Sequence, residues 1–431
     1  MRSIAVIGGG WAGLAAAAEL TSHGQSVTLF EASRTPGGRA RGLNWKGKRL
    51  DNGQHILVGA YRQTLRLMQM AGVDISQALL RQPLQLVQHG KFSLHASRFL
   101  PAPLHVLSGL MLAKGLGKRE RLAALGLMTK LKLKQFRITH DEPLAGFLAR
   151  HHQPDQLVHL LWEPLCLAAL NTPLTQASTQ VFLNVLRDSF ASAKSESDRL
   201  LPRRDLGQLF ADPVSAYIQK HGGSIRLGKT VTAIRQENSA YVIACGEEEE
   251  HFSHVILAVP PYRLAELVTA LPMLNGAASM AEALTYQPIF TVYLQFPQSV
   301  QLPSPMTGLT GGHTQWVLDR GLLCGDAGLL AAIISAEGPH LNITQEALAS
   351  QVLQELNTAF PGLPPPLWHK VIAEKRATFA CLPNLKRPPQ RTPLPGLYLA
   401  GDYTEGDYPA TLEGAVRSGI KCAELLLTSP T

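Results

Sequence analysis

The sequence predicts an α/β fold whose nucleotide-binding domain is discontinuous, and three separate stretches of the 431-residue chain predict it. The first is a strand, a glycine-rich turn and a helix at the N-terminus. The second is a set of short β-runs within residues 222–259, and the third is a strand near residue 400 that ends in Gly-Asp. Parallel strands that alternate with helices form a Rossmann-like sheet, so we expect the three stretches to meet in one sheet.

The glycine-rich turn has G-x-G-x-x-G spacing at Gly8, Gly10 and Gly13, directly after the apolar run Ile4–Ile7. Gly8 allows a tight turn, Gly10 lets the backbone approach a pyrophosphate, and Gly13 lets helix and strand pack closely. This spacing alone is weak evidence, and a purely structural glycine turn is the alternative. The flanking strand and helix favour a nucleotide site.

The segment after the turn supplies two further parts of that site. A helix is expected over about residues 12–22, so Trp11 and Ala12 lie at its N-terminus, where free N–H groups bind phosphate. The next apolar run, Ser26–Phe30, ends at Glu31. A carboxylate at this strand end is expected to accept hydrogen bonds from an adenosine ribose and to repel a 2′-phosphate, which disfavours NADP.

The loop Gly37-Gly38-Arg39 favours a flavin over a nicotinamide dinucleotide. Two adjacent glycines remove side chains from a loop expected beside the pyrophosphate. Arg39 can donate a charge-assisted hydrogen bond to that group. Taken alone, the same residues could form a plain Pro-Gly-Gly turn.

The C-terminal stretch supports the longer cofactor. A buried strand is expected to end at Gly401-Asp402, and a helix is expected over about residues 411–427. Asp402 can hold the ribityl or phosphate end of a flavin dinucleotide. The positive N-terminus of the helix would favour a reduced, anionic flavin ring.

The middle stretch completes the predicted domain division. Its β-runs are Gly222–Leu227, Val231–Ile234, Tyr241–Ala244 and Val255–Val259, with Glu247–Glu250 expected as a solvated hairpin tip. The nucleotide domain is therefore expected over residues 1–75, 205–261 and 396–431. A helical, membrane-facing insert is expected over 76–204 and an α+β substrate domain over 262–395.

Several motifs beyond the nucleotide site resemble one enzyme family. They are Asp51-Asn52-Gly53-Gln54-His55, Trp162-Glu163-Pro164-Leu165, Leu170-Asn171-Thr172, Leu201-Pro202 before Leu206-Gly207, Gly401-Asp402-Tyr403 and Pro409–Ala415. Across almost the whole chain, the sequence resembles the flavin amine oxidase and phytoene desaturase superfamily. Within it, the motifs are similar to the squalene-associated branch, the hydroxysqualene dehydroxylases.

The resemblance implies FAD as cofactor, and no metal is expected because the histidines lack metal-ligand spacing. The residues expected to bind FAD are Gly8, Gly10, Trp11, Ala12, Gly13, Glu31, Gly37, Gly38, Arg39, Gly53, Gln54, His55, Val231, Gly401, Asp402, Thr411, Leu412, Glu413 and Ala415. It also implies that reduced flavin delivers hydride from N5 to hydroxysqualene, whose hydroxyl leaves to give squalene.

Four side chains are candidates for the proton donor in that reaction. His55 lies in a loop that the family places by the flavin, and Asp407 and Tyr408 lie between the Gly-Asp motif and the last helix. Glu163 stands in an apolar run, where desolvation would raise its pKa. Each has a structural alternative: His55 orients the flavin, Asp407 forms a turn, Tyr408 lines the cavity wall, and Glu163 caps a turn or pairs with an arginine.

The expected substrate is a long hydrocarbon of the polyprenyl or triterpene type. The run Leu157–Leu170 is almost entirely apolar and is expected to line the substrate compartment, and few side chains could cage an ammonium ion. A carotenoid-type desaturase, with hydride transfer in the opposite direction, remains open. So do an amine oxidase and a flavin-binding module that carries a polyprenyl intermediate without catalysis.

One basic segment suggests an anionic membrane as partner. Residues 81–137 carry eleven Lys and Arg against the single acid Glu120, while the whole chain has a net charge of only +8. Aliphatic residues are interleaved with these charges, as in surfaces that dock on anionic lipid. The alternative is a helical cap whose lysines face water. Nucleic-acid binding is disfavoured, since the segment has few aromatic residues: Phe92, Phe99 and Phe136.

The cysteine content and the N-terminal sequence suggest the cellular compartment of the protein. The five cysteines are scattered without metal-ligand spacing, as expected of reduced thiols in the cytoplasm. The chain starts almost directly with a strand, which leaves no room for a signal peptide. No window has about 20 uninterrupted apolar residues, so we expect peripheral association with the cytoplasmic membrane. The resemblance also implies upstream enzymes of squalene synthesis as candidate partners.

Overall fold

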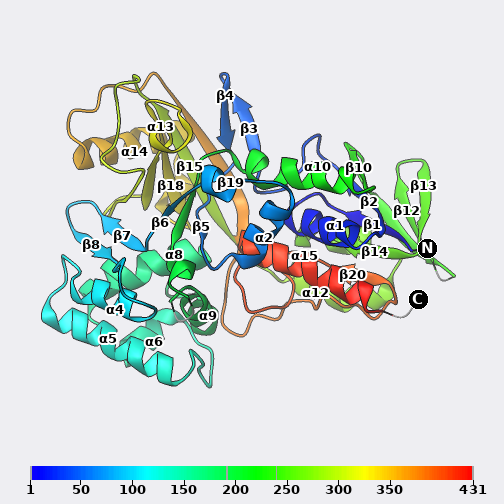
Figure 1. The fold of residues 1–431 in the computed structure, drawn as a ribbon, viewed down its shortest axis with the longest axis horizontal. Coiled ribbons are helices and arrows are strands. Elements are labelled where there is room, and N and C mark those ends of the chain that lie inside the picture. Colours follow the sequence, from blue (N-terminus) through cyan, green and yellow to red (C-terminus); the bar gives the residue numbers. More distant parts are fainter. Residues whose placement is uncertain (1, 191–192, 239, 430–431) are drawn as a thin grey trace.

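The computed structural model describes residues 2–190, 193–238 and 240–429. A five-stranded parallel sheet, at the right in Figure 1, is assembled from all three stretches. Its strands, in spatial order, are β10 (Ser224–Leu227), β2 (Ser26–Glu31), β1 (Ser3–Ile7), β14 (His254–Leu257) and β20 (Leu397–Leu399). The predicted discontinuous sheet is therefore confirmed.

Helices cover this sheet and pack unusually closely on one another. The helices of this region are α1 (Trp11–Ser22), α2 (Arg62–Met70), α3 (Ile75–Ala78), α10 (Asp212–Lys220) and α15 (Leu412–Leu427). A Cβ on Gly419 of α15 would lie only 2.0 Å from the Ala12 carbonyl oxygen of α1. Glycine at this position thus lets α1 and α15, from opposite ends of the chain, pack with their backbones in near contact (Figure 1).

A small antiparallel sheet beside the nucleotide sheet corrects one expectation. It contains β11 (Ala233–Glu237), β12 (Ala240–Cys245) and β13 (Glu248–Phe252). The hairpin turn is Gly246-Glu247, whereas Glu248–Glu250 continue as strand β13, so four glutamates do not form the tip. Basic side chains offset their charge: the pairs are Glu248–Lys229, Glu249–Arg235 and Glu250–Arg226.

A seven-stranded mixed sheet forms the second large layer. Its strands, in order, are β19 (Trp368–Phe379), β15 (Tyr286–Gln295), β18 (Leu329–Ser335), β17 (Trp316–Asp319), β16 (Met306–Gly308), β7 (Gln85–Gln88) and β8 (Phe92–His95). The helices of residues 261–359 are α11 (Pro261–Leu267), α12 (Asn275–Glu282), α13 (Arg320–Cys324) and α14 (Gln345–Ala359). Strands β7 and β8 belong to the segment expected as a helical insert, so that segment also extends the large sheet.

Two small sheets connect these layers. One pairs β3 (Gly42–Trp45) with β4 (Lys48–Asp51), and the other contains β5 (Leu57–Val58), β9 (Arg199–Pro202) and β6 (Leu79–Gln82). Strand β4 ends at Asp51, where the predicted Asn52–His55 loop begins.

The helical region contains α4 (Leu104–Met111), α5 (Lys118–Leu133), α6 (Leu144–Arg150), α7 (Asp155–Leu157), a π-helical turn (Val158–Trp162), α8 (Glu163–Leu170) and α9 (Thr179–Phe190). The apolar run Leu157–Leu170 supplies buried core residues here and lines neither of the two described cavities. Its buried members pack in the main core, so the two cavities give no support to the expected lining role, which stays a prediction. Within the described residues, no helix has the length and apolarity needed to cross a bilayer.

Candidate cofactor site

A cavity of about 500 Å³ lies at the carboxyl ends of the parallel strands, between the nucleotide sheet and the large sheet. Ligands bind at this edge in open α/β sheets. The predicted FAD-binding residues that line it are Gly8, Gly10, Trp11, Ala12, Glu31, Gly37, Gly38, Arg39, Gly53, His55, Val231, Gly401, Asp402, Thr411, Leu412 and Ala415. Residues from all three separate stretches thus surround one space.

The glycines of the turn have two different roles: two are required by protein packing, and one leaves room for a ligand. A Cβ on Gly8 would lie 2.4 Å from the Ala258 carbonyl oxygen, and one on Gly13 would lie 1.9 Å from the Gly8 oxygen. Protein packing therefore demands both glycines. A Cβ on Gly10 would meet no heavy atom nearer than the Gly38 Cα at 4.0 Å. The protein itself has room there, so the missing side chain fits a ligand that passes across Gly10.

Glu31 is held in a fixed orientation at the end of β2. Its Oε2 accepts a hydrogen bond of 2.6 Å from the Gly9 N–H, and its Oε1 accepts hydrogen bonds from the backbone and hydroxyl of Ser33. Each carboxylate oxygen has a further lone pair. The buried Glu31 can therefore still accept a hydrogen bond from a ribose hydroxyl in the cavity.

Trp11 supports the second glycine loop. Its indole Nε1 donates to the Ala40 carbonyl at 3.0 Å, and its ring stacks on Phe210 with centroids 4.0 Å apart. The Gly37 N–H donates to the Gly9 carbonyl at 2.8 Å, which joins the two glycine loops. Their backbones form one side-chain-free wall of the cavity.

The N-terminus of α15 faces the same cavity. Thr411 is the N-cap, and its hydroxyl accepts a hydrogen bond of 3.1 Å from the Gly414 N–H. Leu412 and Ala415 line the cavity from the first turn. The positive end of the helix dipole is therefore placed to stabilise negative charge on a ligand.

Tyr403 is a cavity residue that sequence reasoning missed. Its side chain is 1% exposed, and its hydroxyl has no hydrogen-bond partner among the described residues. Burial raises the pKa of this phenol, so it keeps its proton and can donate. A buried donor without an acceptor indicates a ligand oxygen at this place. Its position directly after Gly401-Asp402 was the one available signal.

His55 is the predicted proton donor that lines the cavity. Its Nδ1 lies 2.8 Å from the Gly53 carbonyl oxygen, so Nδ1 carries the hydrogen. Burial lowers the pKa of His55, and the charge of Arg39 lowers it further. The neutral ring therefore has an accepting Nε2, which suits a hydrogen-bond acceptor better than an acid.

Gln54 has another role than the predicted one, since it does not line the cavity. Its amide donates to Asp51 Oδ2 at 3.1 Å and to the Tyr293 hydroxyl at 2.7 Å. Burial raises the pKa of Asp51 to about 6, although the charge of Arg320 opposes that shift. This network fixes the loop before His55 against strand β15 of the large sheet.

Glu413 and Gly13 also lie outside the cavity lining. The Glu413 carboxylate is fully buried and accepts hydrogen bonds from the backbone N–H groups of Gln63 and Thr64, at the start of α2. Arg417 adds a charge-assisted bond of 2.7 Å. Glu413 thus ties α15 to α2, and the spacing of its motif gave no sign of that partner.

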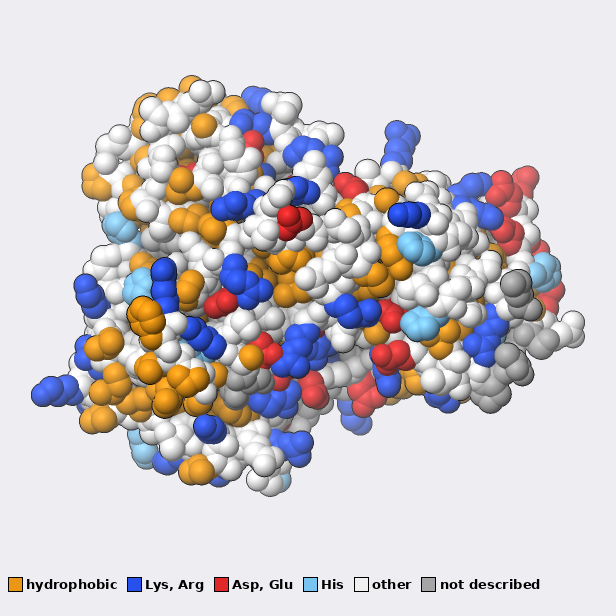
Figure 2. Space-filling view, viewed as in Figure 1, with side chains coloured by type: hydrophobic (Ala, Val, Ile, Leu, Met, Phe, Trp, Pro, Cys, Tyr) orange, Lys and Arg blue, Asp and Glu red, His pale blue; other side chains and the backbone are white. Residues whose placement is uncertain are grey.

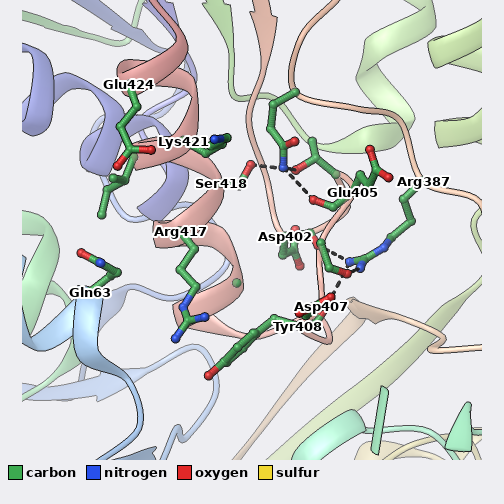
Figure 3. Close-up of a pocket in the computed structure, with 15 residues that line it drawn as sticks. Gln63, Arg387, Asp402, Glu405, Asp407, Tyr408, Arg417, Ser418, Lys421 and Glu424 are labelled. Atoms are coloured by element: carbon green, nitrogen blue, oxygen red, sulfur yellow. Dashed lines mark hydrogen bonds between the residues drawn. The ribbon is translucent and has the colours of Figure 1, made fainter. Parts of the chain in front are cut away.

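Asp407 and Tyr408 line a second pocket, which shares Asp402 with the cofactor cavity (Figure 3). The Asp407 side chain is 72% exposed, 3.8 Å from Arg187. The Tyr408 hydroxyl donates to Asp188 at 2.9 Å. Neither lines the cofactor cavity, which corrects their expected place beside the flavin. The loop turns outward because Arg387 binds its backbone carbonyls.

Glu163 also lies in a different environment from the predicted one. Its side chain is 43% exposed, and its Oε2 lies 3.1 Å from Nδ1 of His159, one turn earlier. The expected desolvation was wrong, because the π-helical turn before α8 leaves the carboxylate on the surface while neighbouring apolar residues point inward.

Comparisons with known proteins agree with this site. The family model for flavin containing amine oxidoreductase matches residues 11–427. Hydroxysqualene dehydroxylase of Rhodopseudomonas palustris is 28% identical over 99% of each chain. Zeta-carotene desaturase of Zea mays is 22% identical over 96% of this chain and 82% of its own.

A solved structure shares the fold. Cyclohexylamine oxidase of Brevibacterium oxydans superposes with a TM-score of 0.72 at 16% identity, covering 99% of this chain and 98% of that one. The family match spans nearly the whole chain. The cavity also has the features that a flavin dinucleotide requires: a wall of glycine backbone, a buried carboxylate that can accept a hydrogen bond, and a buried hydroxyl donor without a partner. The chain belongs to the flavin-containing amine oxidoreductase family and is an FAD-dependent oxidoreductase.

Proposed function

We propose that this enzyme removes the hydroxyl group of hydroxysqualene with reduced FAD and releases squalene. The observation that carries the proposal is the similarity to a hydroxysqualene dehydroxylase along the full length of both chains. The motifs that suggested that branch from the sequence include the Asn52–His55 loop, which reaches the cavity through Asn52, Gly53 and His55.

The proposed reaction balances as a two-electron reduction. The C–O bond breaks, the hydroxyl leaves as water after gaining one proton, and a hydride forms a new C–H bond at the same carbon. Reduced FAD, when bound, would supply the hydride and would lose two electrons in doing so. The hydroxyl-bearing carbon is allylic, so positive charge that develops on it is delocalised. The enzyme has to hold this carbon close to the cofactor and away from bulk water.

Different residues of the chain would bind the cofactor and admit the substrate. The glycine wall, Arg39 and Glu31 would hold the dinucleotide, and the N-terminus of α15 would stabilise a reduced, anionic ring. Ile289 of β15 and Thr378 of β19 bring the large sheet to the cavity, so substrate is expected to enter from that side.

His55 is the predicted donor that a substrate in this cavity can reach. Its neutral ring and accepting Nε2 fit a residue that binds the substrate hydroxyl, with Nε2 as the hydrogen-bond acceptor. Asp407, Tyr408 and Glu163 stand outside the cavity, so a direct proton transfer from them would need the loop or helix to move.

A carotenoid-type desaturation is the second candidate, favoured by the similarity to zeta-carotene desaturase. That reaction uses the same fold with hydride moving from the hydrocarbon to oxidised flavin. An amine oxidation has less support, because the cavity lining includes four cations, Arg39, Arg41, Lys229 and Arg263, beside the three carboxylates Glu31, Glu374 and Asp402.

Anaerobic mixing separates the two candidates. Photoreduced enzyme with hydroxysqualene should regain the yellow colour of oxidised flavin, and mass spectrometry should identify squalene as product. Oxidised enzyme with phytoene or zeta-carotene should stay oxidised. Bleaching of the oxidised flavin by a carotene, without any reaction of the reduced enzyme with hydroxysqualene, would assign the desaturase function instead.

A further inference from the structure

The helical region exposes an apolar surface that the proposed reaction does not use. Seven of the thirteen large apolar side chains exposed in the described chain fall between residues 99 and 133. They are Phe99, Leu100, Leu104, Met111, Leu112, Leu122 and Leu133, which we name the docking face. Phe99 is 95% exposed and Leu133 is 80% exposed. Figure 2 shows orange side chains interleaved with blue ones over the region of α4 and α5.

Helix α5 carries two of its leucines on the side that faces away from the protein core. With 3.6 residues per turn, positions spaced by four, three and four residues form one line along a helix. The outward line of α5 is Leu122, Gly126, Thr129 and Leu133. The buried residues, on the opposite side, are Ala124, Leu127 and Leu131. A helix that simply covers a core places its charges at the outward line. In α5 that line bears two exposed leucines instead.

The basic residues of α5 flank this line on both sides. The same angular spacing puts Lys118 and Lys132 on one flank and Arg119 and Lys130 on the other, and all four are exposed. Long basic side chains in this position can reach the level of lipid headgroups while apolar neighbours enter the layer below them.

Most basic residues of this segment also lack an acidic partner among the described residues. Of the eleven Lys and Arg within residues 81–137, Arg81 pairs with Asp198. Across the described ranges, no carboxylate lies within 4.0 Å of the nitrogen atoms of the other ten. The positive charge is therefore available to an outside partner.

We propose that the docking face binds the surface of a bilayer that contains anionic lipid, with the apolar side chains inserted below the headgroups. Charge complementarity selects this occupant, since an apolar face ringed by unpaired cations matches an apolar layer bordered by phosphates. A second copy of the chain would oppose the same cationic segment across a two-fold axis. The described residues contain no spanning helix, so the association is peripheral.

Vesicle co-sedimentation at low ionic strength tests the proposal with the purified holoenzyme. Phosphatidylcholine vesicles that contain phosphatidylglycerol should bind the protein, and vesicles of phosphatidylcholine alone should bind it much less. The triple variant Lys130→Gln, Lys132→Gln and Lys134→Gln should lose roughly 100-fold in apparent partition coefficient, given the usual contribution of a basic side chain at an anionic leaflet. Added salt should reduce the difference.

The matched control removes three exposed lysines from other parts of the chain: Lys220→Gln, Lys375→Gln and Lys386→Gln. It has the same net charge as the first variant and should bind vesicles like the unmodified protein. A second variant, Leu122→Gln with Leu133→Gln, keeps every charge and should still lose vesicle binding. Flavin absorbance and thermal midpoint report whether each variant is folded.

Several results would overturn the proposal. Equal loss in the control triple variant would show that net charge alone acts, without a defined face. Binding to neutral vesicles as strong as to anionic ones would refute the charge selection. Dimers that form without lipid and disappear in the leucine variant would assign the face to a second copy. These readouts need no substrate, so they are independent of the proposed reaction.

Discussion

Arg39 and Asp402 form an ion pair, with Nη2 and Oδ1 2.6 Å apart, although 363 positions separate them in the chain. Arg39 also donates to the Ala377 carbonyl at 2.9 Å, at the end of β19. One guanidinium thus joins the N-terminal glycine loop, the C-terminal Gly-Asp motif and the large sheet. All three segments border the cofactor cavity, and Arg39 keeps further N–H donors for a phosphate.

Replacing Arg39 with methionine should weaken FAD binding by about 10- to 100-fold, because a hydrogen bond to a charged group contributes about 1.5–3 kcal/mol. Titration of apoprotein with FAD, followed by flavin fluorescence, measures the change. Arg39→Lys keeps the charge and should recover part of the affinity. Unchanged affinity in both variants would remove Arg39 from the cofactor site.

Gly10→Val should abolish retention of FAD while leaving the protein folded. A Cβ at this position would meet no protein atom nearer than the Gly38 Cα at 4.0 Å, so the clash is expected with the ligand. The control is Gly276→Val, at a helical glycine that also has no neighbour within 4 Å. The purified control should be yellow and the Gly10 variant colourless, with similar circular dichroism. A yellow Gly10→Val protein contradicts the assignment.

Tyr403→Phe should affect the two states of the protein in opposite directions. The unpartnered hydroxyl costs desolvation without FAD, so the apoprotein should be as stable as before or slightly more stable. With FAD, the lost donor should lower affinity by about 3- to 10-fold, equivalent to roughly 0.5–1.5 kcal/mol. Thermal midpoints with and without FAD check both effects. Equal destabilisation of both states would indicate a packing role alone.

The lowered pKa of His55 predicts a loss of stability in acid. The unfolded chain takes up this proton near the ordinary pKa of about 6.5, whereas the folded protein takes it up at lower pH. The contribution of His55 is therefore present above about pH 6.5 and lost as the pH falls, by at most about 1.4 kcal/mol per pH unit. The variant His55→Asn keeps a donor for Gly53 and lacks this proton. Its urea midpoint should fall less between about pH 7.5 and about pH 5.5 than that of the unmodified protein, and parallel curves would contradict the prediction.

The sequence was sufficient for the nucleotide sheet because its signals are local. The apolar runs, the glycine spacing and the residues at the strand ends were sufficient to locate six elements to within a few residues: β1, α1, β2, β14, β20 and α15. Glu248–Glu250 were misjudged because their compensation is not local: the paired cations come from neighbouring segments of the chain. The apolar run Leu157–Leu170 gave no sign of whether its partner was substrate or protein core.

In the cofactor site, too, backbone positions could be predicted from the sequence, whereas side-chain roles could not. Backbone positions such as Gly10 and Gly38 follow from spacing, and the structure brings both to the cavity. Side-chain roles depend on what lies opposite in space. Glu413 looked like a cofactor ligand, yet the start of α2 takes its carboxylate. Asp407 followed the Gly-Asp motif closely, yet Arg387 holds that loop outward. Tyr403 was passed over because its sequence position was its one signal, whereas the missing hydrogen-bond partner shows only in the structure.

A single turnover in D₂O tests the proposed reaction most directly. The N5 hydrogen of reduced flavin exchanges with solvent, so photoreduced enzyme in D₂O carries deuterium at the position that transfers hydride. With unlabelled hydroxysqualene, the account predicts squalene that contains one deuterium bound to carbon, together with oxidised flavin. Recovery of unchanged hydroxysqualene and still-reduced flavin, or squalene without deuterium, would contradict reductive dehydroxylation by this enzyme.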